Sequence, residues 1–441
     1  MGSPSPDEVI YRNDGLAWGS SMKTLKDYVA EVVKKAKAAS WVTARLKDSA
    51  KNRVLLEVGR LLGREKKTLE RENQKDLRLA EKKKLSPALI DRLTLTPKRI
   101  EEMCEGIKVV VGLEDPIGKI QGEWCRPNGL RISKVTVPLG VIFIIYESRP
   151  NVTSECASLC LKSGNAVILR GGSEAFHSNL ALVNLYHSAL RTCHLPEACV
   201  SFVKVLDHRA VDLFLEEEEA INLVIPRGGE ALIRRVAARS RIPVIKHYKG
   251  VCHLYIDRKA DLDQALKIAL NAKCQRPATC NAMETLLVHE RVAGKFLPVL
   301  GRELEKARCE VRGDRRVREW IPTAKPAQKE DWGREFLDRI LAIRVVPDLE
   351  SAIEHIQKFG SAHTDGIVTE DLRAARRFTE EVDSSSVMVN ASTRFSDGFQ
   401  YGFGAEIGIS TDKIHARGPM GLEGLTSYKY VVEGQGQIRE S

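Results

Sequence analysis

The chain has 441 residues, of which 29% are charged, and it carries a net charge of +10 and ten cysteines. This length allows two or three domains with substantial cores, and no apolar run reaches the ~18 residues that a membrane-spanning helix needs. Residues 1–20 are polar without an apolar signal core, so we predict a flexible extension over residues 1–21. The cysteines lack paired spacing, which favours a reducing cytoplasmic location.

The positive charge is spread along the chain in short basic runs, which include Lys34-Lys35, Lys66-Lys67, Lys82 to Lys84 and Arg315-Arg316. Acidic residues interleave with most of these runs, and no stacking aromatics accompany them. Solvated helix faces explain this pattern better than a nucleic-acid-binding surface, which stays the non-enzymatic alternative. A positive balance also suits an anionic substrate and a phosphorylated cofactor.

Apolar residues recur at helical spacing through residues 22–110, and Ser86-Pro87 and Thr96-Pro97 are helix-start signals. Residues 130–137 then alternate apolar with polar, as a half-exposed strand does. Such an arm needs a partner strand, because an unpaired edge is prone to association. Residues 426–432 alternate in the same way and are candidates for that pairing.

Between residues 141 and 247, buried strands alternate with helical segments, which predicts a parallel sheet with helices on both faces. The expected strands are residues 141–146, 166–169, 200–205 and 221–225. Ligands of such sheets bind at the carboxyl ends of the strands. This places Arg149, Asn151, Arg170 to Gly172 and Arg227 to Gly229 along one rim.

Residues 244–250 are interpreted as a crossing between domains, after which the same alternation resumes. We expect strands at residues 253–256, 285–289, 341–346 and 366–369, and helices at 262–269, 296–307, 349–359 and 372–382. Asp348 is a candidate helix cap. Residues 309–332 are charged and irregular, and we assign no element to them.

Neither the dinucleotide fingerprint GxGxxG nor a phosphate-binding P-loop is present. Two other glycine turns, Arg170-Gly171-Gly172 and Arg227-Gly228-Gly229, each end a strand and open a helix. Backbone amides at a helix N-terminus favour phosphate, although ordinary strand–helix turns have the same pattern. Cys156 and Cys160 lie one helical turn apart without companion ligands, so we predict packing there and no metal site.

Cys280 lies in a loop between a helical segment and a buried strand, so it can be held rigidly and remain reachable. Pro277 removes a backbone donor and restrains Ala278 and Thr279 away from a regular helix. The positive charge of Arg276 favours a thiolate, and the backbone amide of Asn281 is placed to stabilise an oxyanion. The alternative is an inert cysteine buried in packing.

Several blocks in a fixed order resemble the γ-glutamyl phosphate reductase family, a branch of the aldehyde dehydrogenase superfamily. The resemblance extends from about residue 23 to about residue 430. The blocks are Val137 to Val141, Tyr146 to Thr153, Lys162 to Gly172, Ile225 to Gly229, Gln275 to Asn281, Asn390 to Phe395 and His415 to Gly421.

The resemblance implies an α/β, aldehyde-dehydrogenase-like fold with two parallel-sheet α/β domains and a β oligomerisation arm. Residues 22–120 and 139–247 would form the cofactor-binding domain, and 248–390 the catalytic domain. The oligomerisation strands would be 121–138 and 424–435. Residues 391–423 would form active-site loops that return to the cofactor domain.

The implied reaction is the NADPH-dependent reduction of L-glutamyl 5-phosphate to L-glutamate 5-semialdehyde in proline biosynthesis, with release of phosphate. Cys280 would attack the acyl carbon and form a thioacyl intermediate. The Asn281 backbone amide and the Asn151 side chain would stabilise the oxyanion.

By the same resemblance, one set of residues would bind NADPH: Arg170, Gly171, Gly172, Ser173, Glu174, Arg227, Gly228, Gly229 and Glu335. A guanidinium at Arg170 would favour NADPH because it can hold a 2′-phosphate. The candidates for substrate binding are Arg149, His253, Asn390, Arg394 and Arg417, with His363 and His415 as further candidates. A surface carboxylate is the alternative for Glu335, and structural ion pairs are the alternative for the arginines.

Aldehyde-oxidising relatives use a glutamate base to activate water, yet no glutamate lies between Glu230 and Glu284. The missing carboxylate favours the reductase direction, and whether His247 acts as a base stays open. The rival enzyme is an NAD(P)-dependent aldehyde oxidoreductase with another acyl donor. We expect a homo-oligomer and, because no kinase half is present, glutamate 5-kinase as a possible separate partner.

Overall fold

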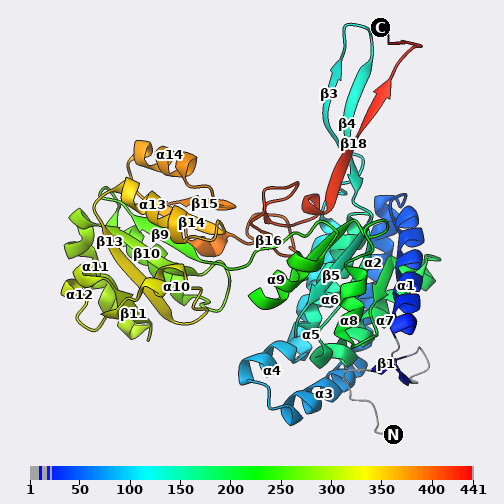
Figure 1. The fold of residues 1–441 in the computed structure, drawn as a ribbon, viewed down its shortest axis with the longest axis horizontal. Helices are drawn as coiled ribbons and strands as arrows, with labels where there is room; N and C mark the ends of the chain where they lie inside the picture. Colours follow the sequence, from blue (N-terminus) through cyan, green and yellow to red (C-terminus); the bar gives the residue numbers. More distant parts are fainter. Residues whose placement is uncertain (1–8, 12–16, 20–21, 440–441) are drawn as a thin grey trace. The chain divides into compact units, whose positions relative to one another are not determined.

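The computed structural model describes residues 9–11, 17–19 and 22–439, and it divides into two units (Figure 1). Unit 1 consists of Met1–Lys246, Phe403–Gly408 and Met420–Ser441, and unit 2 of His247–Gly402 and Ile409–Pro419. The predicted extension over residues 1–21 lies largely outside the described residues. Within it, β1 (Val9–Tyr11) pairs antiparallel with β2 (Ala17–Gly19).

The helical lead-in of unit 1 is confirmed. Its helices are α1 (Met22–Thr43), α2 (Asp48–Arg64), α3 (Lys66–Lys82), α4 (Pro87–Leu93) and α5 (Pro97–Gly112). The Ser86 and Thr96 side chains accept hydrogen bonds from backbone amides in the first turns of α4 and α5, so both start signals were correct. Among the described helices, none is both long and apolar enough to cross a membrane.

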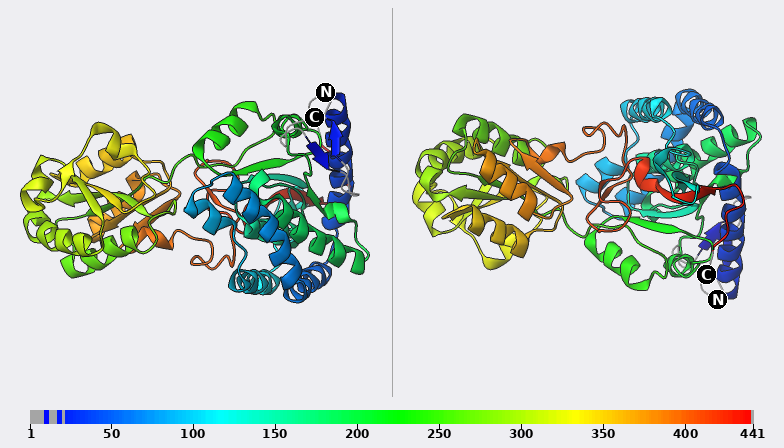
Figure 2. Two further views of the ribbon diagram at one scale, coloured as in Figure 1. Left: turned by 90° about the horizontal axis from the view of Figure 1, so that it is seen from below. Right: turned by 90° about the horizontal axis from the view of Figure 1, so that it is seen from above.

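A parallel four-stranded sheet forms the core of unit 1, in the order β7-β6-β5-β8. The strands are β5 (Val141–Tyr146), β6 (Ala166–Arg170), β7 (Val200–Phe202) and β8 (Leu223–Arg227). Helices α6 (Pro150–Lys162), α7 (Phe176–Thr192), α8 (His208–Phe214) and α9 (Glu230–Arg239) follow these strands, with 3-10 turns η2 (Ser173–Ala175) and η3 (Glu197–Cys199) between them. Every residue of β5 and β6 is buried, as their apolar runs predict. Figure 2 shows the helices around this sheet.

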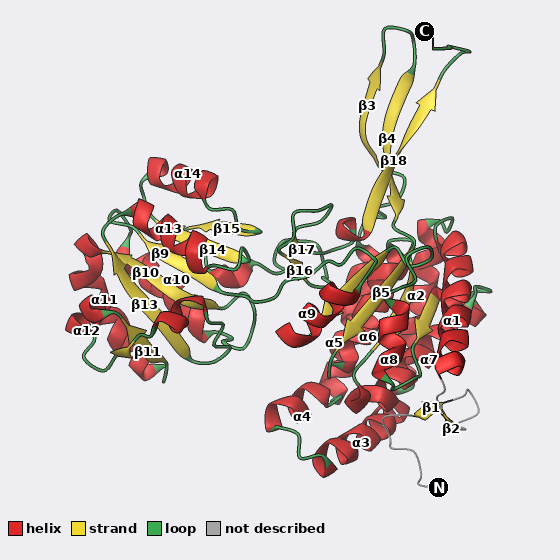
Figure 3. Cartoon of the chain, in the orientation of Figure 1, coloured by secondary structure: helices red, strands yellow, loops and turns green. Residues whose placement is uncertain are grey.

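The arm of unit 1 is an antiparallel sheet in the order β18-β4-β3, drawn in yellow in Figure 3. Its strands are β3 (Ile120–Cys125), β4 (Arg131–Pro138) and β18 (Thr426–Glu433), and η6 (Glu423–Leu425) precedes β18. The predicted pairing is confirmed, with Thr426 opposite Pro138 and Glu433 opposite Arg131. Large apolar side chains stay exposed on the arm: Ile120, Trp124, Tyr428, Tyr430 and Val432.

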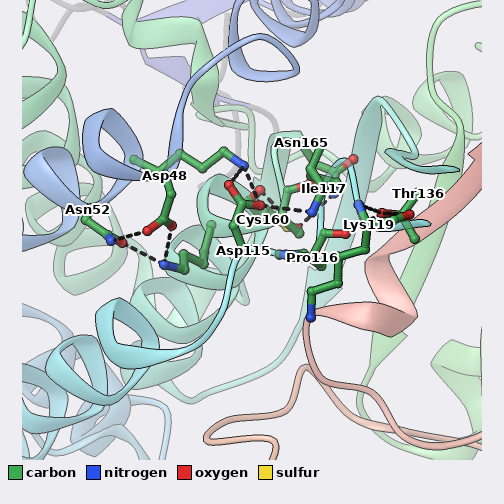
Figure 4. Close-up of polar contacts among 12 residues, drawn as sticks. Asp48, Asn52, Asp115, Pro116, Ile117, Lys119, Thr136, Cys160 and Asn165 are labelled. Atoms are coloured by element: carbon green, nitrogen blue, oxygen red, sulfur yellow. Dashed lines mark hydrogen bonds and ion pairs between the residues drawn. The ribbon is translucent and has the colours of Figure 1, made fainter. Parts of the chain in front are cut away.

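A polar network with two buried lysines connects the lead-in helices to the start of the arm (Figure 4). The ammonium group of Lys162 donates to Asp48 at 2.5 Å and to Asn52 at 2.8 Å. Lys51 donates to Asp115 at 2.8 Å, and that carboxylate also accepts from the backbone amide of residue 117. Each buried charge is therefore paired, which offsets the cost of removing it from water.

Unit 2 is built on a parallel seven-stranded sheet in the order β12-β11-β13-β10-β9-β14-β15. Its strands are β9 (Cys252–Ile256), β10 (Met283–His289), β11 (Glu310–Gly313), β12 (Lys325–Pro326), β13 (Ile340–Val346), β14 (Thr364–Val368) and β15 (Ser386–Val389). Its helices are α10 (Leu262–Cys274), α11 (Glu290–Lys306), α12 (Arg315–Trp320), α13 (Leu349–Phe359) and α14 (Leu372–Glu381). A short pair, β16 (Ile409–Ser410) with β17 (Gly418–Pro419), and the turns η4 (Lys329–Gly333) and η5 (Thr393–Phe395) complete the unit.

Alternate residues of the central strands pack into two different cores. Leu254 of β9 and Leu286 of β10 face α10 and α11, and Tyr255 and Leu287 face α13 and α14. The strands are therefore buried on both faces, which explains why they are continuously apolar. The Asp348 side chain accepts from the backbone amide of residue 351, so the predicted cap of α13 is confirmed.

Residues 309–332, to which the sequence assigned no element, form the edge of the sheet. Arg312 on β11 donates to Glu310 at 2.9 Å and to Asp331 at 2.7 Å. The many charged residues hide the strand pattern in the sequence, and in the structure these ion pairs neutralise the charges of Arg312, Glu310 and Asp331. The strand is only four residues long, so no clear alternation is visible either.

Candidate active site

Cys280 lies in a short loop of unit 2 between α10 and β10, as the sequence predicts. Asp261 caps α10 by accepting from the backbone amides of residues 263 and 264. After the helix ends, the Thr279 hydroxyl oxygen lies 2.9 Å from the Arg276 carbonyl, and the backbone amide of Ala282 donates to the Thr279 carbonyl at 3.0 Å. Cys280 itself is half-buried, so its thiol is not sealed in the core.

The side chain of Asn281 fastens this loop to a neighbouring segment. Its amide nitrogen donates to the carbonyl of Ser396 at 2.9 Å, and its oxygen accepts from the Thr279 hydroxyl at 3.0 Å. The side chain is buried, so both bonds satisfy groups that are out of water. The oxyanion role concerns the Asn281 backbone amide and stays a prediction.

Cys252 of β9 and Gly250, which lies just before this strand, both contact the backbone of Cys280. The Cys252 thiol donates to the Cys280 carbonyl at 3.2 Å. Burial raises the pKa of the Cys252 thiol well above its usual range, so it stays protonated and can donate. A Cβ atom on Gly250 would lie 2.0 Å from the same carbonyl oxygen, so only glycine allows this approach.

Two histidines gather at Cys280. One ring nitrogen each from His247 and His363, together with the Cys280 sulfur, lie within 4.8 Å of one another. The two rings pack edge to face with their centroids 5.5 Å apart. The sequence left the role of His247 open, and the structure places one of its ring nitrogens within 4.8 Å of the Cys280 sulfur.

The two imidazoles differ in burial. His363 is fully buried, and this burial together with the nearby His247 lowers the pKa of His363 to about 3. Its Nδ1 is 2.8 Å from the Thr364 hydroxyl. His247 is half-buried, and its Nδ1 donates to the backbone carbonyl of Ile409 at 2.9 Å. A carbonyl oxygen can only accept, so Nδ1 carries the hydrogen in the neutral His247 ring and Nε2 is the basic nitrogen.

Glu335, the predicted contact of the cofactor ribose, lies near this loop. Its carboxylate accepts from the backbone amide of Gly250 at 2.9 Å, and the side chain is half-buried. Gly250 lies directly against the Cys280 backbone, so the Glu335 carboxylate is linked to that backbone through Gly250. The contact with a ribose hydroxyl stays a prediction.

Arg394 is the predicted substrate arginine that the structure brings to the Cys280 loop. Its Nε donates to the Gln275 side chain at 2.9 Å. Burial lowers the pKa of Arg394, and the nearby positive charge of Arg276 adds to this effect. Two guanidinium groups close together form a positive patch that suits a substrate anion.

The other predicted substrate residues of unit 2 are engaged elsewhere. Arg417 donates to the Asp383 carboxylate at 2.7 Å and to its carbonyl at 2.9 Å. The side-chain amide of Asn390 exchanges two hydrogen bonds of 2.9 Å with the backbone of Thr369. Both contacts are structural, and a role in substrate binding for these two residues stays a prediction.

The expectation for His253 needs correction. Its ring is fully buried in β9, and Nδ1 lies 2.8 Å from the Asp365 carboxylate, which is also fully buried. A side chain enclosed in the sheet has no surface on which substrate can bind. The sequence misled here because His253 is the second residue of β9, a strand that is buried along its whole length.

The structure confirms that the predicted rim residues of unit 1 follow neighbouring parallel strands. Because β6, β5 and β8 are adjacent and parallel, the residues that follow them lie at one edge of the sheet. Arg149, exposed, precedes α6 at its N-terminus, and Asn151 lies in the first turn, where its amide donates to Glu155 at 2.8 Å. Their roles in catalysis and binding stay predictions.

The end of β6 carries an excess of hydrogen-bond donors. The guanidinium of Arg170 donates to the carbonyls of Gly171 and Leu206, and burial lowers its pKa. Among the described residues, neither Arg170 Nε nor the buried Nδ2 of Asn179 has a hydrogen-bond partner. A Cβ atom on Gly171 would come within 2.1 Å of that Asn179 nitrogen, so only glycine allows this close approach. Unsatisfied donors fit an anionic ligand such as a cofactor phosphate.

Carboxylates lie against both glycine turns. Glu174, which follows Gly172 and Ser173 in η2, accepts from the Ser148 hydroxyl at 2.5 Å. Glu147 accepts from the Gly229 amide at 3.0 Å, at the N-terminus of α9. A Cβ atom on Gly228 would lie 2.5 Å from that Glu147 oxygen. The helix terminus after Arg227 therefore binds an anionic group, as its dipole predicts, although the anion is a side chain of the chain itself.

Comparison with known proteins gives a consistent result. The model of the aldehyde dehydrogenase family matches residues 3–333. The γ-glutamyl phosphate reductase of Carboxydothermus hydrogenoformans is 55% identical, with 94% of this chain and 100% of that protein covered. The enzyme of the same name from Thermodesulfovibrio yellowstonii is 52% identical with the same coverage.

Solved structures agree with these relatives. The crystal structure of γ-glutamyl phosphate reductase from Thermotoga maritima matches with a TM-score of 0.92 and 46% identity, covering 93% of this chain and 100% of that chain. An acetylating aldehyde dehydrogenase from Geobacillus thermoglucosidasius matches with a TM-score of 0.66 and 17% identity, covering 95% and 99%. The second match supports the fold alone.

Proposed function

The chain belongs to the aldehyde dehydrogenase family, and to its γ-glutamyl phosphate reductase branch, and on this premise we propose that it reduces L-glutamyl 5-phosphate with NADPH. The products are L-glutamate 5-semialdehyde and inorganic phosphate, and the pathway is proline biosynthesis. The observation that carries the proposal is the position of Cys280, half-buried on a fixed loop and accompanied by His247.

The first step is the attack of the Cys280 sulfur on the acyl carbon of the substrate. We assign His247 as the group that accepts the thiol proton, because its Nδ1 is held by Ile409 and its Nε2 is the basic nitrogen. His363 is less suited to carry a proton, since burial lowers its pKa to about 3. The Asn281 backbone amide and the Asn151 side chain are the proposed donors to the oxyanion.

Collapse of the tetrahedral adduct breaks the bond to phosphate and leaves a thioester on Cys280. Arg394 and Arg276 form the positive patch beside the loop that we assign to the anionic substrate. Arg149, Asn390 and Arg417 remain proposed contacts of the substrate. No glutamate lies between Glu230 and Glu284, which supports a thioester that is protected from activated water.

Members of the aldehyde dehydrogenase family use nicotinamide cofactors, and a reduced nicotinamide supplies the hydride that converts the thioester to the aldehyde. We propose that the rim of unit 1 binds this cofactor, through Arg170, Gly171, Gly172, Ser173 and Glu174 at β6 and Arg227, Gly228 and Gly229 at β8. The unsatisfied donors of Arg170 and Asn179 support a phosphorylated cofactor. Glu335 is the proposed contact for the nicotinamide ribose.

Three further assignments rest on the same premise. We propose a homo-oligomer formed through the arm, whose apolar side chains are exposed. We also propose a cytoplasmic location, which suits a catalytic thiol and is supported by the absence of disulfides among the ten cysteines described. A glutamate 5-kinase is the proposed source of the acyl phosphate.

The test is the reverse reaction of the purified protein. Glutamate semialdehyde and NADP⁺ should give NADPH only when inorganic phosphate is added. Cys280→Ser should lower the rate at least about a thousandfold, and Cys193→Ser, which removes a half-buried thiol of unit 1, should not. NADPH formation without phosphate, or with coenzyme A in its place, would favour the rival oxidoreductase with another acyl donor.

A further inference from the structure

The cluster of His247, Cys280 and His363 has the composition of a metal site as well as of a catalytic one. All three donor atoms lie within 4.8 Å of one another. Two imidazoles and one thiolate form a donor set that suits zinc and similar soft divalent cations. Ligands around a tetrahedral zinc ion lie roughly 3.3–3.8 Å apart, so closing the cluster on an ion needs movements of about 1 Å.

The histidines are oriented as ligands usually are. A metal-binding imidazole commonly directs its second ring nitrogen to a carbonyl, carboxylate or other polar group, which fixes its orientation. His247 directs Nδ1 to the Ile409 carbonyl at 2.9 Å, and His363 directs Nδ1 to the Thr364 hydroxyl at 2.8 Å. In His363 this contact leaves Nε2, which has no hydrogen-bond partner among the described residues, as the nitrogen available for a metal.

A second, independent observation concerns His363. This side chain is fully buried, and among the described residues its Nε2 has no hydrogen-bond partner. A buried polar atom without a partner is costly, so its presence calls for an explanation. His363 directly precedes β14, and one of its ring nitrogens lies within 4.8 Å of the donor atoms of the half-buried Cys280 and His247. A cation bound to Nε2 would remove this cost.

We propose that His247, Cys280 and His363 form a three-ligand site for Zn²⁺, and that occupation of this site reversibly inhibits the enzyme. Two protein nitrogens and one sulfur hold the ion, and water completes the fourth position. The sulfur binds as thiolate, so its proton passes to the solvent when the metal enters. The electron pair that would attack the substrate is then donated to the metal.

Inhibition rests on the proposed role of Cys280, but metal binding does not. The test therefore begins with binding of Zn²⁺ to the full chain, without substrate, by equilibrium dialysis. We expect one ion per chain at micromolar Zn²⁺. Cys280→Ser, His247→Gln and His363→Gln should each weaken binding at least about tenfold. The variant with Cys193→Ser and His194→Gln, which removes one thiol and one imidazole from unit 1, should bind as the wild type does.

Replacement of Zn²⁺ by Co²⁺ gives a second measurement. Wild type should show the sulfur-to-cobalt charge-transfer band, and Cys280→Ser should lose it. Addition of a chelator should remove the metal ion from the protein, and the reductase rate should then return to its value without metal. Absence of stoichiometric binding, or undiminished binding by His247→Gln and His363→Gln, would overturn the proposal. A protein that binds zinc but lacks phosphate-dependent activity would instead overturn the proposed function and leave the site intact.

Discussion

Gly250 approaches Cys280 so closely that a Cβ atom at position 250 would lie 2.0 Å from the Cys280 carbonyl oxygen and 2.7 Å from its Cα atom. Neither contact is tolerable, and both involve backbone that cannot rotate away. The loop that carries the nucleophile is therefore positioned by a residue 30 places earlier in the chain. In addition, the amide of Gly250 is bonded to Glu335, so the two predicted site residues are coupled through a glycine.

We predict that Gly250→Ala displaces the Cys280 loop. A shift of about 1 Å in a reacting atom costs roughly a hundredfold in kcat/KM, so we expect a loss of this size. The matched control is Gly106→Ala on α5, where an added Cβ meets nothing within 4 Å. That change should leave turnover unaltered and stabilise the helix by about 0.5–1 kcal/mol. Steady-state kinetics and urea unfolding measure both effects, and normal turnover of Gly250→Ala would refute the positioning role.

The element containing Cys280 could be predicted from the sequence because its neighbours carry strong signals. Apolar residues at helical spacing over residues 262–269 mark α10, and the continuous apolar run of β10 marks a strand buried on both faces. The proximity of Cys280 to His363 could not be predicted. It depends on the pairing of β9 with β14, two strands separated by more than 100 residues in sequence. Local patterns carry no information on such pairings.

The second prediction concerns the fully buried ion pair behind the Cys280 loop. Lys273 of α10 donates to Glu284 of β10 at 2.5 Å, and Glu284 also accepts from the Leu337 amide. Burial raises the pKa of Glu284 to about 7, and the Lys273 ammonium opposes that rise. Lys273→Met leaves the carboxylate buried without its partner, and we expect the free energy of unfolding to fall by about 3–5 kcal/mol.

The double variant separates charge from packing. Lys273→Met with Glu284→Gln keeps an acceptor for the Leu337 amide and removes the buried charge, so it should regain most of the stability lost by Lys273→Met. Urea unfolding monitored by tryptophan fluorescence measures the midpoints of the three proteins. If the double variant is no more stable than Lys273→Met, the loss comes from packing and the electrostatic explanation is wrong.

The third prediction concerns the arm of unit 1. Trp124 and Tyr430 pack edge to face with ring centroids 6.1 Å apart, and both remain largely exposed. Exposed aromatic rings on a sheet favour association with another chain. Replacing both residues by Glu should produce a smaller assembly in light scattering after size-exclusion chromatography. Trp41→Glu alters an exposed tryptophan on α1 and should leave the mass unchanged. An unchanged mass for the double variant would exclude the arm as the interface.

The fourth prediction concerns acid stability and depends on His355 in α13. Burial lowers the pKa of His355 to about 2, and the charges of His253 and Arg344 contribute. The Arg344 guanidinium donates to Nδ1 at 3.0 Å, a bond that requires an unprotonated nitrogen there. The folded chain therefore keeps His355 neutral at pH values where the unfolded chain, with a histidine pKa of about 6.5, takes up a proton.

The sign of the effect follows from this difference. Stability from the neutral ring is fully present above about pH 6.5, and it is lost by up to about 1.4 kcal/mol per pH unit as the pH falls toward 2. In His355→Asn, the side-chain oxygen can replace Nδ1 as the acceptor for Arg344 and takes up no proton. We expect the free energy of unfolding of this variant to fall less steeply between pH 6.5 and 5, where most carboxylates are still ionised. His194→Asn on the surface controls for the loss of a histidine, and equal slopes for wild type and His355→Asn would show that His355 does not govern the acid response.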